Sequence, residues 1–333
     1  MPTDGMTVAV TGPTGTFGMA LMPLLEAEDR ISRVTGIARR PFDPAEHGWT
    51  KMRYIRGDVR EPEALEEAFS GADVVVHLAF MITGAARQGT IRAINVDGTL
   101  NAFRAAASAG VTRFVYASSV AAYGFHRDNP VGMTEEWPAR PDPHLFYARE
   151  KAEIEALLRE EQVAHPEVDA YILRPPIVLG PHAVGAKNVL PDRLEPIARR
   201  LARLVRSLPV ALPVPTPRLP LQFIHEEDVA RALLLCIVGG GPAGTYNITG
   251  DDVLTVNEVA RELRLAPLPV PSAVAQTAAR AVARIPFAPA VAEWAEAASH
   301  PAIMDASKAK RELGWRPRHT SLGALRESLQ SET

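Results

Sequence analysis

Apolar runs of β type alternate with stretches of helical periodicity through the first half of the chain. The expected strands are Thr7–Val10, Val34–Ala38, Met52–Ile55, Asp73–Leu78, Arg113–Ala117 and Ala170–Leu173. The expected helices lie near Phe17–Ala27, Pro62–Phe69, Ile91–Ala109 and Phe146–Gln162. This alternation is typical of parallel strands joined by crossover helices. The pattern therefore predicts an α/β fold built on a doubly wound parallel sheet.

The pattern changes after Pro175, where prolines become frequent. Proline at this density favours loops and short helices over a continuing sheet. Gln222–His225 and Gly244–Ile248 are expected as two further strands, with a helix over Glu226–Val238 between them. We therefore expect a larger domain formed by residues 1–180 and about 222–248. A smaller, discontinuous, mostly helical domain is expected from residues 181–221 and about 249–333.

Composition narrows the choice of partners. The 333 residues carry 36 Lys and Arg against 39 Asp and Glu, for a net charge of −3. No long run of either sign occurs, so nucleic-acid binding is not expected. The start of the chain lacks a signal-peptide pattern and no apolar stretch is long enough for a membrane span, which favours a cytoplasmic protein without a membrane partner.

Metal ligands are not predicted. Cys236 is the only cysteine, which excludes intrachain disulfides and cysteine-clustered metal sites, and its apolar surroundings suggest a buried side chain. The run from His225 to Asp228 has the composition of a ligand cluster. The simpler interpretation is the acidic first turn of a helix.

A glycine-rich loop follows the first expected strand directly, in the sequence Thr11-Gly12-Pro13-Thr14-Gly15-Thr16-Phe17-Gly18. Gly12 permits a tight turn, Gly15 lets a pyrophosphate approach the backbone, and Gly18 permits close packing of helix on strand. The helix N-terminus then offers N–H groups to the anion. The loop predicts that the larger domain is a dinucleotide-binding Rossmann domain, with contacts from Gly12, Thr14, Gly15, Thr16, Phe17 and Gly18.

The end of the second strand bears on the choice of cofactor. An acidic side chain at that point would hold the ribose 2′-hydroxyl of NAD, but Ala38 stands there and Arg39 and Arg40 follow. Guanidinium groups are well shaped to bind a 2′-phosphate. NADP(H) is therefore favoured over NAD(H).

Tyr147 and Lys151 stand four residues apart in an expected helix, about thirty residues after a strand that leads into Ser118 and Ser119. Residues at this spacing share a helix face, so the ammonium can lie near the phenol. A charge about 4 Å away at an effective dielectric of about 20 is worth roughly 4 kcal/mol, or about three pKa units. The pair therefore predicts a tyrosine whose pKa is lowered towards neutrality, suited to general acid–base work.

Together these motifs resemble the extended short-chain dehydrogenase/reductases of the NAD-dependent epimerase/dehydratase family. The resemblance runs from Val8 to nearly the C-terminus. Besides the glycine loop and the Tyr147–Lys151 pair, it includes Gly57-Asp58-Val59, His77-Leu78-Ala79, Asn95-Val96-Asp97-Gly98-Thr99, Tyr116-Ala117-Ser118-Ser119, Tyr123-Gly124, Leu173-Arg174-Pro175, Phe223-Ile224-His225, Asp228-Val229-Ala230, Tyr246-Asn247 and Glu312-Leu313-Gly314-Trp315.

The resemblance implies roles for individual residues. It makes Tyr147 the proton donor or acceptor, Lys151 the group that lowers its pKa and holds the nicotinamide ribose, and Ser119 the partner of the reacting oxygen. It implies further cofactor contacts from Asp58 and Val59 at the adenine, and from Leu78, Ala79, Asn95, Ser118, Pro175 and Ile177. It also implies a possible homodimer through the helices near Ile91–Ala109 and Phe146–Gln162.

Three departures from the family pattern bear on the substrate. Family members that act on nucleotide sugars use an Asn and an Arg near the diphosphate. In this chain Ile177 stands in place of the Asn and Leu221 in place of the Arg. Arg218, three residues before Leu221, could take the place of that Arg. Val120 and Ala121 replace the Asp-Glu pair of the 4,6-dehydratases. The predicted substrate is therefore a small apolar molecule, in a site lined by Phe80, Met81, Ala121, Phe125 and Leu221.

Three functions remain open from the sequence. The first is hydride transfer between the cofactor and a carbonyl or alcohol carbon of the apolar substrate. The second is epimerisation through a transient ketone, including that of a nucleotide sugar, which would consume no cofactor. The third is a non-catalytic NADP(H)-binding redox sensor or scaffold, which the presence of Ser119, Tyr147 and Lys151 disfavours.

Overall fold

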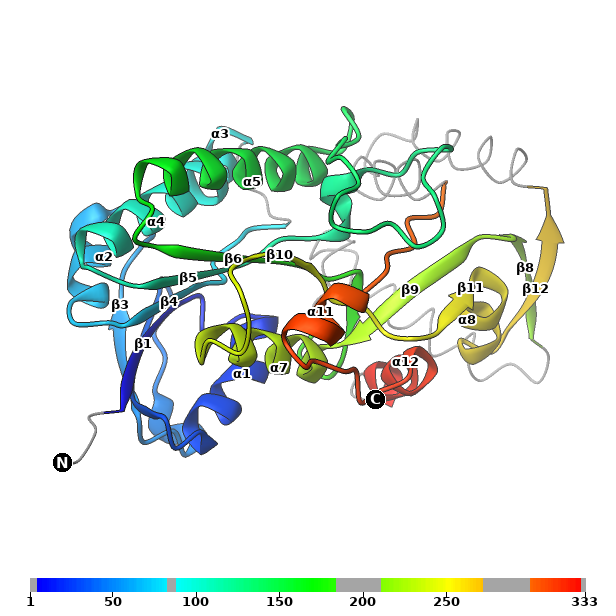
Figure 1. Cartoon of the computed structure of the whole chain (residues 1–333). Coiled ribbons are helices and arrows are strands. Elements are labelled where there is room, and N and C mark those ends of the chain that lie inside the picture. Colours follow the sequence, from blue (N-terminus) through cyan, green and yellow to red (C-terminus); the bar gives the residue numbers. More distant parts are fainter. Residues whose placement is uncertain (1–4, 83–87, 184–210, 272–299, 331–333) are drawn as a thin grey trace.

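The computed structural model describes residues 5–82, 88–183, 211–271 and 300–330. Its centre is a seven-stranded sheet in the order β10-β6-β5-β4-β1-β2-β3, in which every neighbouring pair is parallel (Figure 1). The strands are β1 (Met6–Thr11), β2 (Ile31–Ala38), β3 (Met52–Arg56), β4 (Val74–His77), β5 (Arg113–Ala117), β6 (Asp169–Arg174) and β10 (Gly244–Asn247). The strand order reverses direction between β1 and β4. The predicted doubly wound fold is confirmed, and ligands of such sheets bind beside this reversal.

Helices cover both faces of the sheet. On one face lie α2 (Pro62–Phe69), α4 (Gly98–Ser108) and α5 (Phe146–Ala164), and on the other α1 (Thr16–Ala27) and α7 (Glu226–Ile237) (Figure 1). Each face has its own apolar core, because strands such as β4 are buried on both sides. Cys236 is fully buried in the α1–α7 core, as its apolar surroundings predicted.

The helix expected over Ile91–Ala109 is divided into three parts. A short α3 (Gln88–Arg92) leads into a π-helical segment η2 (Ala93–Asp97) and then into α4. Asn95 lies inside this π-helical segment and is fully buried. Such segments are often found at functional sites, because the widened turn redirects side chains.

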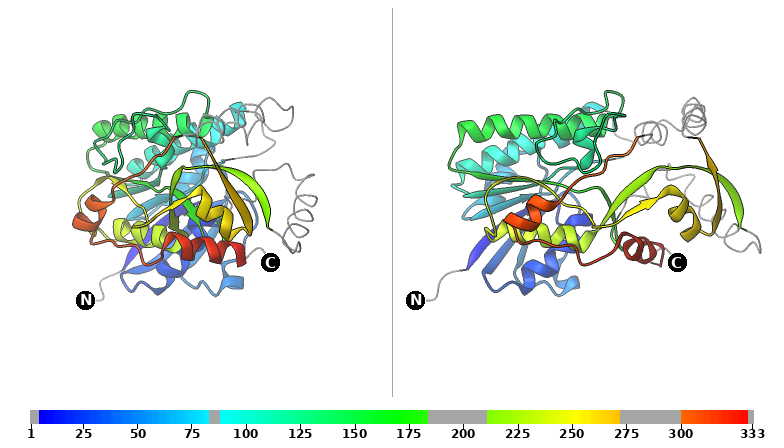
Figure 2. Two further views of the ribbon diagram at one scale, coloured as in Figure 1. Left: turned by 90° about the vertical axis from the view of Figure 1, so that its right-hand side faces the viewer. Right: turned by 45° about the vertical axis from the view of Figure 1, so that its right-hand side comes forward.

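A second region extends from one end of the main sheet (Figure 2). It contains a three-stranded sheet in the order β11-β9-β7 and the parallel pair β8–β12. Its elements are β7 (Ile177–Leu179), β8 (Leu212–Pro217), β9 (Pro220–His225), β11 (Val253–Thr255), α8 (Val256–Glu262), β12 (Leu265–Val270) and α12 (Ser321–Gln330). The helix α11 (Ser307–Glu312), expected in the smaller domain, instead packs on the main domain, where Ala309 and Leu313 join the α1–α7 core.

Two expectations for this region need correction. β9 was expected to belong with the larger domain, but it pairs with β7 and β11 in the small sheet. The proline-rich stretch Leu212–Pro217 was expected as loop or helix, but it forms β8. In a two-stranded sheet each strand keeps one unpaired edge, so prolines at alternate positions of β8 remove no ladder hydrogen bond. The other parts of the predicted small domain, residues 184–210 and 272–299, lie outside the described residues.

None of the helices in the described ranges is long and apolar enough to cross a membrane.

Candidate functional site

The glycine loop between β1 and α1 has the geometry that its spacing predicts. Gly12 has φ of +70°, and a Cβ there would lie 2.9 Å from the backbone nitrogen of Ala79. A Cβ on Gly18 would lie 2.3 Å from the carbonyl oxygen of Pro13. A Cβ on Gly15 would instead meet only the Gly12 oxygen, at 3.4 Å, so the space in front of Gly15 is open.

This open space faces the start of α1, where Gly15 is the N-cap. No side chain caps the helix, and its first turn contains no acidic residue. The free N–H groups and the partial positive charge of the helix end suit an anion. The loop thus fits the pyrophosphate of a dinucleotide. Of its other predicted contact residues, Thr14 and Thr16 are half-buried, and half-buried Phe17 packs on the α1–α7 core.

Arginines surround the carboxyl ends of β2 and β3. Arg39 and Arg40 follow β2 directly and are exposed. Asp58, which follows β3, is nearly buried and accepts two hydrogen bonds from the Arg60 side chain, at 2.7 and 3.0 Å, and a third from its backbone nitrogen. The bond from Arg60 lowers the pKa of Asp58, and the charge of Arg39 contributes. Sequence reasoning missed Arg60, although it directly follows the Gly57-Asp58-Val59 motif.

Ser119 and Tyr147 meet at the carboxyl end of β5. Ser119 caps the short helix η3 (Val120–Tyr123) by accepting a hydrogen bond from the Ala121 nitrogen at 3.2 Å. Tyr147, in the first turn of α5, forms a hydrogen bond with Ser119 that lowers its pKa. Burial has the larger effect and raises the pKa of Tyr147 above its ordinary value. The predicted net lowering is therefore not present in this structure.

The surroundings of Lys151 bear on the pKa of the Tyr147 phenol. Its ammonium is buried, donates to the Ala117 oxygen at 2.7 Å and to the Tyr116 hydroxyl at 3.1 Å, and lies 5.9 Å from the Tyr147 ring centroid. Burial lowers the pKa of Lys151 to about 7, against the opposing effect of Glu155 and Glu150. Burial thus disfavours the charged form of Lys151, which is the form that could lower the pKa of Tyr147.

Two predicted cofactor contacts have other partners in the structure. Asn95 is fully buried, accepts from the Met81 nitrogen at 2.7 Å, and donates to the Met81 oxygen and to Glu150. Ser118 is almost fully buried and donates to Glu155 at 2.6 Å. Their side chains offer little or no surface to a ligand, so they position the backbone after β4 and β5.

The side chains predicted to line a substrate site divide into two groups. Phe80 packs edge-on against Tyr147, with centroids 5.5 Å apart, and its centroid lies 3.7 Å from the Lys151 ammonium. Phe125 packs beside Tyr147 on a small apolar cluster, and half-buried Met81 follows Phe80. In contrast, Ala121 is 1 % exposed, and Leu221 packs against the β9–α12 cluster of Phe223, Leu254 and Leu325.

The remaining predicted cofactor contacts lie at neighbouring strand ends. Leu78 donates its backbone N–H to the Thr11 oxygen at 3.1 Å, which brings the end of β4 against the glycine loop. Val59 and Pro175 are buried. Ile177, at the start of β7, is 45 % exposed.

A chain of polar groups that sequence reasoning did not identify underlies these strand ends. Thr11 bonds His77 Nδ1 at 2.9 Å, and His77 Nε2 bonds Thr99 at 3.0 Å. Burial lowers the pKa of His77 to about 3, so the ring is neutral. A Thr and a His at the carboxyl ends of two otherwise apolar strands are the sequence signal that could have indicated these contacts.

Comparisons with known proteins agree with this arrangement. The family model of the NAD dependent epimerase/dehydratase family matches residues 8–249. Protein y4nG of Sinorhizobium fredii is 28% identical over 326 residues, covering 95% of this chain and 76% of the relative. A ceramide reductase of Caulobacter vibrioides is 31% identical over 237 residues, covering 70% of this chain and 62% of the relative.

Solved structures share the fold. The UDP-glucose 4-epimerase of Thermus thermophilus, solved in complex with NAD, superposes with a TM-score of 0.71 at 23% sequence identity and covers 98% of both chains. The family model spans the glycine loop, the Ser119, Tyr147 and Lys151 positions, and the strands that carry them. The chain therefore belongs to the NAD dependent epimerase/dehydratase family.

Proposed function

We propose that the protein is an NADP(H)-linked oxidoreductase that interconverts a carbonyl and an alcohol on an apolar small molecule. The observation that carries the proposal is the hydrogen bond between Tyr147 and Ser119, formed beside the apolar side chains of Phe80 and Phe125. Two hydroxyl groups that meet in apolar surroundings are suited to hold and protonate one substrate oxygen.

The bound nicotinamide supplies or accepts the hydride. The protein's own residues handle the proton. Because the pKa of Tyr147 is raised, its phenol is protonated at neutral pH and acts as the acid in the reducing direction. Ser119 orients the substrate oxygen through its hydroxyl group.

Cofactor binding in this proposal rests on the glycine loop and the two arginines. The N–H groups at the start of α1 bind the pyrophosphate, and the exposed Arg39 and Arg40 bind the 2′-phosphate of NADP(H). Family membership supports a nicotinamide cofactor. The preference for NADP(H) is supported by Ala38, which lacks the acid that would bind the 2′-hydroxyl of NAD.

An apolar substrate is supported by Ile177 and Leu221. Neither can hydrogen-bond the diphosphate of a nucleotide sugar, and unmatched phosphate charge is costly to bury. The relative named ceramide reductase is, by its name, a reductase of a lipid, which fits carbonyl chemistry on an apolar compound. We therefore place oxidoreduction ahead of nucleotide-sugar epimerisation and of a non-catalytic role.

The test is a screen of apolar ketones, aldehydes and alcohols with purified protein, following NADPH fluorescence. We expect stoichiometric use of cofactor with at least one compound. Tyr147→Phe should reduce turnover about 10²- to 10⁴-fold. Tyr171→Phe is the matched control, because its hydroxyl bonds Gly241 at the far end of the sheet.

Other outcomes would reject the proposal. Conversion without net use of cofactor indicates an epimerase, and tight cofactor binding without turnover of any compound indicates a sensor or scaffold. Full turnover by Tyr147→Phe would remove the proton-transfer role. Micromolar binding of a nucleotide diphosphate sugar would contradict the argument from Ile177 and Leu221.

A further inference from the structure

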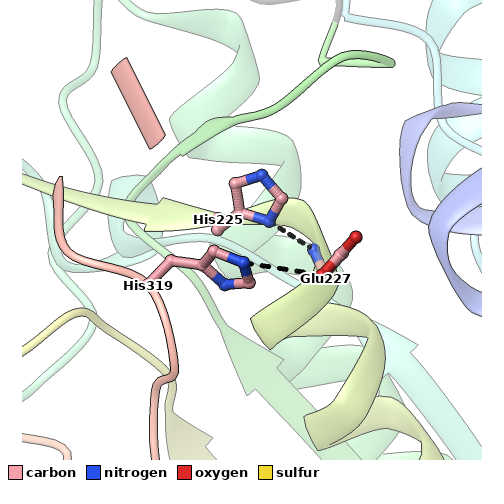
Figure 3. A group of neighbouring side chains, drawn as sticks. All are labelled: His225, Glu227 and His319. Atoms are coloured by element: carbon pink, nitrogen blue, oxygen red, sulfur yellow. Dashed lines mark hydrogen bonds and ion pairs between the residues drawn. The ribbon is translucent and has the colours of Figure 1, made fainter. Parts of the chain in front are cut away.

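A group of titratable side chains meets at the start of α7, formed by His225, Glu227 and His319 (Figure 3). The two imidazole rings stack with their centroids 4.0 Å apart, and His225 Nδ1 accepts the Glu227 N–H at 3.2 Å. The free lone pairs of these rings therefore do not converge, and the group as placed offers no site to a metal ion. Residues 226–228 are the acidic first turn of α7, which confirms the sequence-based interpretation of this run.

A second buried carboxylate lies one helical turn after Lys151. Glu155 is completely buried on α5 and stands four residues after Lys151, so the two side chains share a helix face. Lys151 donates to the Ala117 oxygen at 2.7 Å, and Glu155 accepts from the Ser118 hydroxyl at 2.6 Å. The two side chains therefore bind consecutive residues at the carboxyl end of β5.

Glu155 also binds two arginines. Arg174, the last residue of β6, donates from Nε at 2.9 Å and from Nη2 to the other carboxylate oxygen, and its side chain is buried. Arg159, one turn further along α5, donates at 3.1 Å from a half-exposed side chain. The carboxylate thus fixes α5 to the carboxyl ends of β5 and β6, and it compensates the buried guanidinium of Arg174.

The charge of Lys151 depends on the groups that face it. These are Tyr116 on β5, the neutral His77 on β4, and Tyr147, Glu150 and Glu155 on α5. Burial lowers the pKa of Lys151, and the negative charge of Glu155, followed by that of Glu150, opposes this effect. Glu150 is the weaker partner, because burial raises its own pKa and so favours its uncharged form.

We propose that Glu155 is a positioning residue for the Tyr147 site, whose buried carboxylate keeps the Lys151 ammonium charged and holds it at the end of β5. Lys151 can lower the pKa of Tyr147 only as a cation, so Glu155 acts on the phenol through Lys151. The inference rests on the function proposed for Tyr147. The charge state of Lys151 can nevertheless be measured without any substrate or cofactor.

The chain contains five lysines, so NMR of the full-length protein labelled with ¹³C at the lysine Cε atoms can follow Lys151 individually. The signal that is missing from Lys151→Met assigns the residue. We expect Glu155→Gln to lower the titration midpoint of Lys151 by about one pH unit or more, because a negative charge is removed and Arg174 is left unpaired. A midpoint equal to that of the wild type would overturn the proposal.

Glu153→Gln is the matched control. It makes the same change on the same helix and also leaves an arginine unpaired, because Glu153 binds Arg92 at 2.6 Å, but both side chains are partly exposed. Its Lys151 midpoint should equal that of the wild type. A purely structural role of Glu155 predicts a loss of stability with an unchanged Lys151 midpoint, and that result would also reject the proposal.

A second variant covers the case in which Glu155→Gln does not fold. Combining it with Arg174→Met removes both charges of the buried pair, a change that cores often tolerate. The Lys151 midpoint of this double variant should still lie below that of the wild type, because Glu155 shares a helix face with Lys151 and Arg174 does not. An unchanged midpoint in the double variant would overturn the proposal in the same way.

Turnover gives a further readout once a substrate is found. Because only the charged Lys151 supports Tyr147, the alkaline limb of the kcat profile of Glu155→Gln should move to lower pH by the same interval as the Lys151 midpoint. A limb that stays at the wild-type pH would contradict the link from Glu155 to Tyr147. If no compound is turned over, the proposed oxidoreductase function fails, whereas the Lys151 titration still decides whether Glu155 maintains the ammonium.

Discussion

Lys151 lies where burial opposes its charge. Its ammonium has two hydrogen-bond acceptors and the Phe80 ring around it, yet burial lowers its pKa to about 7 from the ordinary 10.5. Between these two pH values the unfolded chain binds more protons at this residue than the folded chain does. The contribution of Lys151 to stability therefore rises with pH across this window.

Replacing Lys151 with a residue that does not titrate should remove its contribution to the pH dependence of stability. We expect the free energy of unfolding of the wild type, minus that of Lys151→Met, to increase from pH 7 to pH 9 by up to about 1.4 kcal/mol per unit. Urea denaturation of both proteins at matched pH measures the difference, in which the remaining titrating groups cancel. A difference that stays flat or falls with pH would show that the ammonium is not destabilised by burial.

Arg39 and Arg40 give a prediction of cofactor choice. Replacing both with Ala should raise the dissociation constant of NADPH by about 10- to 100-fold, because charge-assisted hydrogen bonds to phosphate are lost. Binding of NADH should change little. Arg53→Ala, which alters an exposed arginine already paired with Glu67, is the control. Equal losses for both cofactors in a fluorescence titration would contradict the assignment to the 2′-phosphate.

At single residues, the sequence predicted partners that are close along the chain better than partners that are distant. Tyr147 and Lys151 share a helix, and that spacing alone brings their side chains to one face. Ser118 and Ser119 are adjacent and both were expected at the site, but only Ser119 reaches Tyr147. Ser118 bonds Glu155, which lies 37 residues further on, and no local pattern indicates that contact.

Among the elements, the strands of the main sheet were predicted well because they are buried on both faces and flanked by clear turns. The division of residues 88–108 was not predicted, because a π-helical segment has the same composition as the helices beside it. β8 was missed because its prolines resemble a loop, and only its pairing with β12 makes the alternate prolines acceptable.

Substitutions in the glycine loop allow an effect on cofactor binding to be distinguished from an effect on stability. A methyl group on Gly15 meets only the Gly12 oxygen, whereas on Gly12 it requires a left-handed backbone and approaches Ala79 to 2.9 Å. We therefore expect Gly15→Ala to keep the free energy of unfolding within about 0.5 kcal/mol of wild type while weakening NADPH binding at least about 10-fold. Gly12→Ala should destabilise the chain by about 2 kcal/mol or more.

Urea denaturation and NADPH fluorescence titration measure the two quantities on the same variants. Wild-type affinity in Gly15→Ala would show that no phosphate approaches the backbone at that position.

At the scale of the whole molecule, the sequence identified separate motifs but not the contacts between them. Asp228-Val229-Ala230 and Glu312-Leu313-Gly314-Trp315 were separate motifs, about 80 residues apart in the chain. In the structure, Trp315 donates its indole N–H to the backbone carbonyl oxygen of Asp228 at 2.9 Å. The Asp228 carboxylate accepts hydrogen bonds from the backbone nitrogens of Arg318 and His319. One buried aspartate thus holds the C-terminal segment on α7.

Asp228→Asn should therefore weaken the docking of the whole C-terminal segment. The buried carboxylate accepts three hydrogen bonds from that segment and one from Arg231, and an amide, with its single oxygen, cannot accept them all. We expect a loss of about 3 kcal/mol in the free energy of unfolding, measured by urea denaturation. Asp251→Asn is the matched control, because Asp251 is exposed and pairs only with Lys310, and it should change stability by less than about 1 kcal/mol. Equal effects of the two substitutions would show that Asp228 does not hold the segment.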